Sequence, residues 1–127
     1  MFIMQTKANE LFETAQEKLN EAKEELFRPK EDIVSYLVCK NSQVAIENYL
    51  KGYLLKNGVD IDDCDTIDSL FKQCVAVNSN FKKVDLSDLE CKGHDLNSRY
   101  CNEVFKVSKC FDAADDLDTF LRQEKII

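Results

Sequence analysis

The stretch NSQVAIENYLKGYLLKNG, residues 41–58, decides the fold of this chain. Its apolar residues cover more than one face of a helix, which indicates a central helix with several neighbours. We expect the helix to begin near Asp32, a residue type that caps helix N-termini, and to stop at Asn57-Gly58. Gly52 lies in its middle, where glycine costs about 1 kcal/mol relative to alanine. Close approach by another helix explains this glycine better than a functional role does.

The preceding segment, residues 7–27, has the pattern of an amphipathic helix. Apolar side chains recur at alternating steps of four and three, and Glu and Lys fill the other face. The helix should end at Arg28, because the residue before a proline disfavours the helical conformation. The apolar stripe consists of Ala8, Phe12, Ala15, Leu19, Ala22 and Leu26.

After the central helix the sequence predicts one shorter helix, a short helical piece and a last long helix. The shorter helix starts at a capping residue, Asp65 or Thr66. The polar run of residues 78–83 is predicted to be a loop. Short helical turns follow within residues 86–96, and the last helix begins near Asn102.

These elements predict an all-α protein. Three glycines and one proline leave few turn formers, which favours long helices with short connections. An up-and-down antiparallel four-helix bundle with one extra short helix is the simplest way to bury the apolar stripes. By size we expect a single helical domain over residues 1–127. Phe105 and Phe120 lie off the main stripe of the last helix, and either they or the central helix could supply an apolar patch for a homodimer.

The net charge of −7 argues against indiscriminate binding to nucleic acids or membrane surfaces, because such binding needs a basic face. Lys82-Lys83 is only a pair, and no longer basic block stands out. The first residues do not resemble a signal peptide, and no run approaches the roughly 18 apolar residues of a membrane span. We therefore expect a cytoplasmic protein whose six cysteines are reduced and mostly buried.

The sequence does not predict a metal or a cofactor. The acidic stretch of residues 60–65 lacks the central glycine and the closing glutamate of an EF-hand. Cys91, His94 and Cys101 are metal-capable residue types, but a structural zinc site needs four ligands and a paired CxxC spacing is missing. Cys101, near Arg99 at a helix N-terminus, is the best candidate for a reactive thiol, although a structural role suits it better.

Several stretches, in order along the chain, resemble the HEPN family (higher eukaryotes and prokaryotes nucleotide-binding domain). In residues 41–59 a small residue, Ala, an apolar residue, Glu and the pattern LKxxLxxxG follow one another as in that family. TIDSLFKQC (66–74), LNSRYCN (96–102) and VSKCFDAADDLDTFL (107–121) resemble its later segments. The resemblance covers about residues 5–123, and order and spacing support it more than any single motif does. The matching residues of the first stretch are Ala45, Ile46, Glu47, Leu50, Lys51, Leu54 and Gly58.

The resemblance implies an α-helical bundle, frequent homodimers, and roles as ribonucleases or as partners of small nucleotidyltransferases in toxin–antitoxin and defence modules. Ribonuclease members use an arginine and, after a spacer of four to six residues, a histidine. The histidine can move the proton of a ribose 2′-hydroxyl, and the arginine can stabilise charge on the phosphate. Arg99 matches this arginine, but Val104, Phe105 and Lys106 occupy the window of the histidine, and His94 lies on the other side. This chain therefore resembles a divergent member without the catalytic histidine.

We interpret Arg99 and Tyr100 as structural residues that tie the start of the last helix to Glu47 or another carboxylate. A role for these three residues in binding a ligand or partner is the second interpretation. The third is a metal-independent ribonuclease that uses Arg99 with His94, or with a residue from a second subunit.

The leading hypothesis is a non-catalytic binding or regulatory domain. Its candidate partners are a second copy of the chain, as a homodimer, and a nucleotidyltransferase-type protein. A nucleotide or an RNA is a further candidate ligand, and a membrane is not expected. A metal or redox protein is a third class, and it rests on the cysteines alone.

Overall fold

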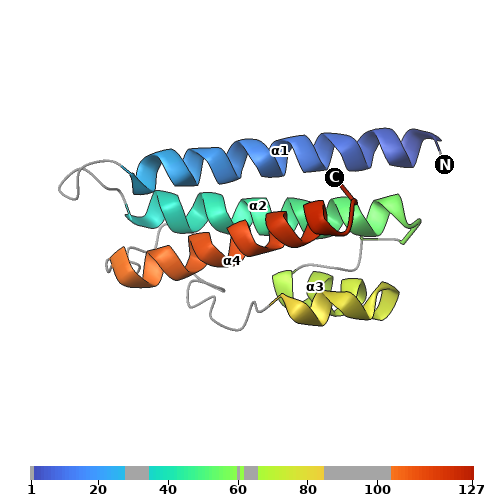
Figure 1. Cartoon of the computed structure of the whole chain (residues 1–127). Helices are drawn as coiled ribbons and strands as arrows, with labels where there is room; N and C mark the ends of the chain where they lie inside the picture. The colour runs from blue at the N-terminus through green and yellow to red at the C-terminus, as the bar shows by residue number, and fades with distance from the viewer. Residues whose placement is uncertain (1, 28–34, 60, 62–65, 85–103) are drawn as a thin grey trace.

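The computed structural model describes residues 2–27, 35–59, 61, 66–84 and 104–127, and most of these residues lie in helices (Figure 1). Four α-helices and one 3-10 helix within these residues confirm the predicted all-α bundle. The elements are α1 (Phe2–Leu26), α2 (Ser35–Lys56), α3 (Ile67–Val77), the 3-10 helix η2 (Ser79–Lys83) and α4 (Val104–Gln123).

Helix α2 is central, as its apolar residues predicted. It packs against α1, α3 and α4, and its interface with α1 is the most extensive one between the described helices. Figure 1 shows α1 running beside α2 in the opposite direction over almost its whole length, whereas α4 lies along α2 in the same direction. Helix α3 packs near the C-terminal end of α2 (Figure 1). Three neighbours thus cover the several apolar faces of this helix.

Gly52 allows α1 and α2 to approach closely. A Cβ atom at this position would lie 2.7 Å from Cε1 of Phe12 and 3.2 Å from the carbonyl oxygen of Ala8. Carbon atoms in contact prefer a separation of about 3.5–4.0 Å, so α1 occupies the space that a side chain would need. The prediction that another helix explains this glycine is confirmed.

The same interface shows matching periods in the two helices. Small or short side chains recur every seven residues on α1, and the residues that face them recur every seven residues on α2. Because the helices are antiparallel and Ala8 lies beside Gly52, equal steps in opposite directions bring the next members level with each other. We infer that Ala15 lies beside Ala45 and Ala22 beside Val38, and all four are at 0% exposure.

Two helix ends follow from their local sequence. Gly58 has a φ of 74°, a conformation that glycine adopts without strain, and the amide of Val59 donates to the carbonyl of Leu54 at 2.9 Å. The predicted stop of the central helix is therefore confirmed. Thr66 caps α3, because its hydroxyl oxygen accepts a hydrogen bond from the amide of Ser69 at 3.1 Å.

The prediction of a loop over residues 78–83 is wrong, because residues 79–83 form the 3-10 helix η2. The side chain of Asn78 accepts a hydrogen bond from the amide of Asn80 at 3.0 Å and starts this helix. Phe81 is fully buried and anchors η2 to the core. One apolar side chain in a polar run holds η2 against the core. Because the run has no periodic apolar pattern, the sequence did not predict a helix there.

Phe81 also decides the environment of Phe120. The two rings are 4.8 Å apart between centroids in an edge arrangement, and Phe81 packs on Tyr53 at 4.6 Å. Phe120 is consequently 6% exposed, so its expected place in an exposed apolar patch is wrong. The side chain of Phe105 lies outside the described part of the chain.

Other predictions fall on residues that the structure does not describe. These are the cap at Asp32 and the helical turns within residues 86–96. Within the described ranges, none of the helices combines the length and the apolar character that crossing a membrane requires.

Candidate functional site

Of the predicted site residues, Glu47 is the one that the structure describes. It lies half-buried on α2, where Nζ of Lys51, one turn later, is 2.7 Å from its Oε1. Such a partly exposed pair within one helix contributes only about 0.3–0.5 kcal/mol. Arg99, Tyr100 and His94 lie outside the described residues, so the proposed tie between Arg99 and Glu47 stays a prediction.

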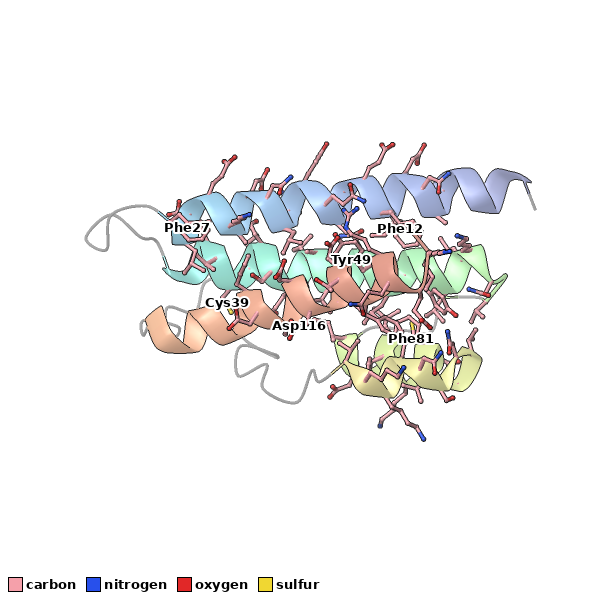
Figure 2. The ribbon with its side chains drawn as sticks, in the orientation of Figure 1. Phe12, Phe27, Cys39, Tyr49, Phe81 and Asp116 are labelled. Atoms are coloured by element: carbon pink, nitrogen blue, oxygen red, sulfur yellow. The ribbon has the colours of Figure 1, made fainter. Side chains whose placement is uncertain are left out.

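A polar network that the sequence analysis missed links α2 to α4. The hydroxyl of Tyr49 donates a hydrogen bond to Oδ1 of Asp118 at 2.5 Å. The Nε–H of Arg122 donates to Oδ2 of the same carboxylate at 2.9 Å. Figure 2 shows Tyr49 on α2 in the middle of the bundle, where α4 passes alongside. Both oxygens of one carboxylate are therefore engaged by donors from two helices.

Burial and charge define the protonation state of this network. Desolvation by burial raises the pKa of the Tyr49 hydroxyl well above its ordinary value, and the hydrogen bond to Asp118 raises it further. The hydrogen bond to Asp118 also raises the pKa of Arg122. At neutral pH Tyr49 is a neutral donor and Arg122 a cation, so neither is prepared to accept a proton. The arrangement suits a clamp between helices rather than a proton-transfer pair.

The sequence held a partial signal for this network. Asp118 and Arg122 are four residues apart on one helix, a spacing at which opposite charges meet. The ring of Tyr49 is fully buried, as the apolar character of the central helix predicts. Nothing in the sequence indicates that its hydroxyl reaches a residue 69 positions away.

A pair of sulfur atoms forms a second junction between α2 and α4. Sγ of Cys39 lies 3.4 Å from Sγ of Cys110, and the side-chain amide of Gln43 donates to Cys39 at 3.4 Å. Cys39 is disulfide-bonded. This state of Cys39 differs from the expectation of reduced cysteines. The expected burial is confirmed for Cys39, Cys74 and Cys110.

The described residues contain no group of three or more His, Cys, Asp or Glu side chains that could hold a metal ion. The acidic residues 60 and 62–65 and the set of Cys91, His94 and Cys101 fall outside those residues. The sequence-based arguments about calcium and zinc therefore stay predictions.

Comparison with known proteins adds one match. A family model described as the HEPN domain matches residues 8–122, which include the helical core, the Tyr49 network and the Arg99 segment. No curated protein and no solved structure gives a significant match to the chain.

Proposed function

The chain belongs to the HEPN domain family over residues 8–122, and from this premise we propose that it is a binding or regulatory domain without a catalytic centre of its own. The sequence after Arg99 carries the proposal. Val104, Phe105 and Lys106 stand where ribonuclease members place their histidine, and the chain's one histidine, His94, precedes the arginine. Without an imidazole in that window, the residues after Arg99 lack the usual group for taking the proton of a ribose 2′-hydroxyl.

The junction of α2 and α4 supports this proposal. Its central polar group, Asp118, is held on both oxygens by Tyr49 and Arg122. Asp118 is only 14% exposed, and hydrogen bonds that occupy both oxygens favour a fixed position over reaction with a ligand. The best-connected polar residues of the described part thus stabilise the bundle.

We propose a homodimer and a nucleotidyltransferase-type protein as the partners, within a toxin–antitoxin or defence module. The support for both is the family membership, since such assemblies are what the resemblance implied. A nucleotide or an RNA is a further candidate ligand, and Arg99, Tyr100 and Glu47 are its proposed contacts. A gene for a nucleotidyltransferase next to the gene for this chain would support the protein partner.

The second candidate is a divergent metal-independent ribonuclease that uses Arg99 with His94 or with a residue from a second subunit. It is favoured by the presence of Arg99 at the position that matches the family's arginine. Arginine can stabilise charge on a phosphate even where another group moves the proton.

RNA cleavage in the presence of EDTA separates the two candidates. We expect the wild-type chain to leave RNA intact, and Arg99→Ala and His94→Ala to behave identically. Arg122→Ala is the matched control, because it removes an arginine that pairs with Asp118. Robust wild-type cleavage that is lost in Arg99→Ala or His94→Ala, with unchanged melting temperature and with activity retained in Arg122→Ala, would establish the ribonuclease instead.

A further inference from the structure

Asn57 and Gly58 follow the last residue of α2 in an exposed turn, at the green end of this helix in Figure 1. The side-chain amide of Asn57 donates a hydrogen bond to the carbonyl oxygen of Tyr53 at 2.9 Å. The backbone amide of Gly58 donates to the carbonyl oxygen of Leu55 at 3.0 Å. The residues that stop the helix are thus held by hydrogen bonds to its last turn.

The same two residues carry a reactive pair of atoms. The backbone nitrogen of Gly58 can attack the side-chain carbonyl carbon of Asn57 and close a succinimide ring. Because glycine has no Cβ atom, no side chain shields this nitrogen, and the backbone rotates more freely than at other residues. We propose that Asn57 is a site of spontaneous deamidation, which the intact end of α2 restrains and the opened end permits.

The reaction needs only water as a co-reactant. The amide of Gly58 gives its proton to the solvent, and its nitrogen attacks Cγ of Asn57. The bond from Cγ to Nδ2 breaks, and Nδ2 leaves with the electron pair, takes up a proton and departs as ammonia. Water then opens the ring at Cγ, which leaves an aspartate, or at the backbone carbonyl carbon, which leaves an isoaspartate. No atom is oxidised or reduced.

The fold restrains the attack through both hydrogen bonds. The bond to Tyr53 holds the side chain of Asn57 against the preceding turn, whereas the attack needs this side chain beside the following residue. The bond to Leu55 engages the proton that Gly58 has to lose. Both bonds lie at a helix end, where local opening requires little free energy. The rate of deamidation therefore reports the population of the opened end.

Deamidation weakens the turn that restrains it. A carboxylate in place of the amide cannot donate to the carbonyl oxygen of Tyr53, and it adds a negative charge where the helix dipole is already negative. The ring of Tyr53 packs on Phe81 at 4.6 Å between centroids, so the weakened turn adjoins the contact of α2 with η2. This inference is independent of the proposed binding function.

Ageing of the full-length chain tests the proposal. The folded chain and the chain in urea are kept at the same slightly alkaline pH and temperature, sampled over time and digested with trypsin. Cleavage after Lys51 or Lys56 and after Lys72 leaves Asn57 as the only asparagine of its peptide. Mass spectrometry detects the change from amide to acid, and chromatography separates aspartate from isoaspartate. A sample digested at time zero corrects for deamidation during digestion.

In urea we expect Asn57 to deamidate before Asn78 and Asn80, which are followed by serine and phenylalanine. Isoaspartate should appear beside aspartate, because direct hydrolysis of the side chain gives aspartate alone. In the folded chain the rate should be about tenfold lower than in urea, which corresponds to an opening free energy of about 1.4 kcal/mol. Gly58→Ala, measured in urea, should slow the reaction because its methyl group shields the nitrogen.

A pair of variants tests the consequence for α2. Asn57→Asp should lower the melting temperature of the folded chain, because it introduces the charge and removes the donor at the helix end. Asn20→Asp is the matched control, since it makes the same change of charge at an exposed position within α1. It should lower the melting temperature less.

Five results would overturn the proposal. Three come from the wild type: a rate in the folded chain that equals or exceeds the rate in urea, aspartate without isoaspartate, and earlier deamidation of Asn78 or Asn80 in urea. The others are an unchanged rate for Gly58→Ala in urea, and a melting temperature of Asn57→Asp that is no lower than that of Asn20→Asp. The wild-type results keep the proposal testable even if a variant fails to fold.

Discussion

Tyr49 packs in the core with its ring and links α2 to α4 with its hydroxyl group. The ring is fully buried in the core, and the hydroxyl reaches the carboxylate of Asp118 on α4. A hydrogen bond to a charged partner contributes about 1.5–3 kcal/mol when it is intact. The link is therefore one of the stronger polar contributions in the described structure.

Tyr49→Phe should lower the free energy of unfolding by about 1–3 kcal/mol at neutral pH, because Asp118 loses a donor but keeps Arg122. The measurement is urea unfolding followed by circular dichroism. Arg122→Ala, which removes the more exposed donor, should cost less. Equal stability of wild type and Tyr49→Phe would show that the hydrogen bond contributes nothing.

The pH dependence of stability should also depend on Tyr49. Its pKa is raised in the folded chain above the ordinary value of 10.0, so the folded state keeps a proton that the unfolded state loses. The stabilisation is fully present below pH 10 and is lost as pH rises above it, by up to about 1.4 kcal/mol per pH unit. The stability difference between wild type and Tyr49→Phe should therefore shrink from pH 10 upwards. If the stability difference between wild type and Tyr49→Phe stayed constant above pH 10, the pKa of Tyr49 would not be raised in the folded chain.

Ser42 is a contrasting residue, because its hydroxyl is fully buried and has no hydrogen-bond partner among the described residues. Ser42→Ala removes the cost of that buried oxygen and improves helix propensity, so it should stabilise the chain by about 1–2 kcal/mol. Thr66→Ala is the comparison, since it removes a hydroxyl that caps α3 and should destabilise by about 1 kcal/mol. Thermal unfolding of both variants checks the prediction, and a loss of stability in Ser42→Ala would refute it.

At the scale of an element, the interface of α1 and α2 depends on how little volume lies between them. Gly52→Ala gains about 1 kcal/mol of helix propensity but places a methyl group against Phe12. Overpacking of this kind costs about 1–3 kcal/mol, so we expect a net destabilisation of up to 2 kcal/mol in urea unfolding.

A double variant tests whether the loss of stability in Gly52→Ala comes from contact with Phe12 or from the introduction of an alanine as such. Adding Phe12→Leu to Gly52→Ala frees space where the new methyl group would meet the ring of Phe12, so the two changes together should cost less than the sum of each alone. At Gly58, where φ is 74°, an added Cβ atom would have no atom of the described residues within 4 Å, so we expect Gly58→Ala to cost about 1 kcal/mol because of the backbone conformation. Strict additivity at positions 12 and 52 would mean that the ring of Phe12 is not the obstacle.

At the scale of the whole molecule, we predict a symmetric homodimer. Light scattering should give about twice the chain mass of 14.6 kDa at micromolar concentrations. The basis of this prediction is the family membership, because homodimers are frequent among the proteins that the chain resembles. A mass that stays at the monomer value over the whole concentration range would remove the dimer from the proposed function.

Local patterns made most of the architecture predictable, whereas contacts between distant positions did not follow from them. The period of α1, the cap at Thr66 and the close approach at Gly52 each depend on neighbouring residues or on the absence of a side chain. The anchoring of η2 by Phe81 depends on which residues the tertiary fold brings together. The same holds for the bond from Tyr49 to Asp118. Family resemblance pointed to Arg99, but the described structure leaves its role a prediction.

The matched seven-residue periods of α1 and α2 restrict how this chain can change length in evolution. Inserting one residue within α1 would rotate every later side chain by about 100° and move Ala15 or Ala22 away from its partner on α2. An insertion between Leu26 and Ser35, after the end of α1 and before the start of α2, leaves the seven-residue spacing within each helix unchanged. Related chains should therefore differ in the number of residues at that connection while keeping the two helical segments free of insertions and deletions.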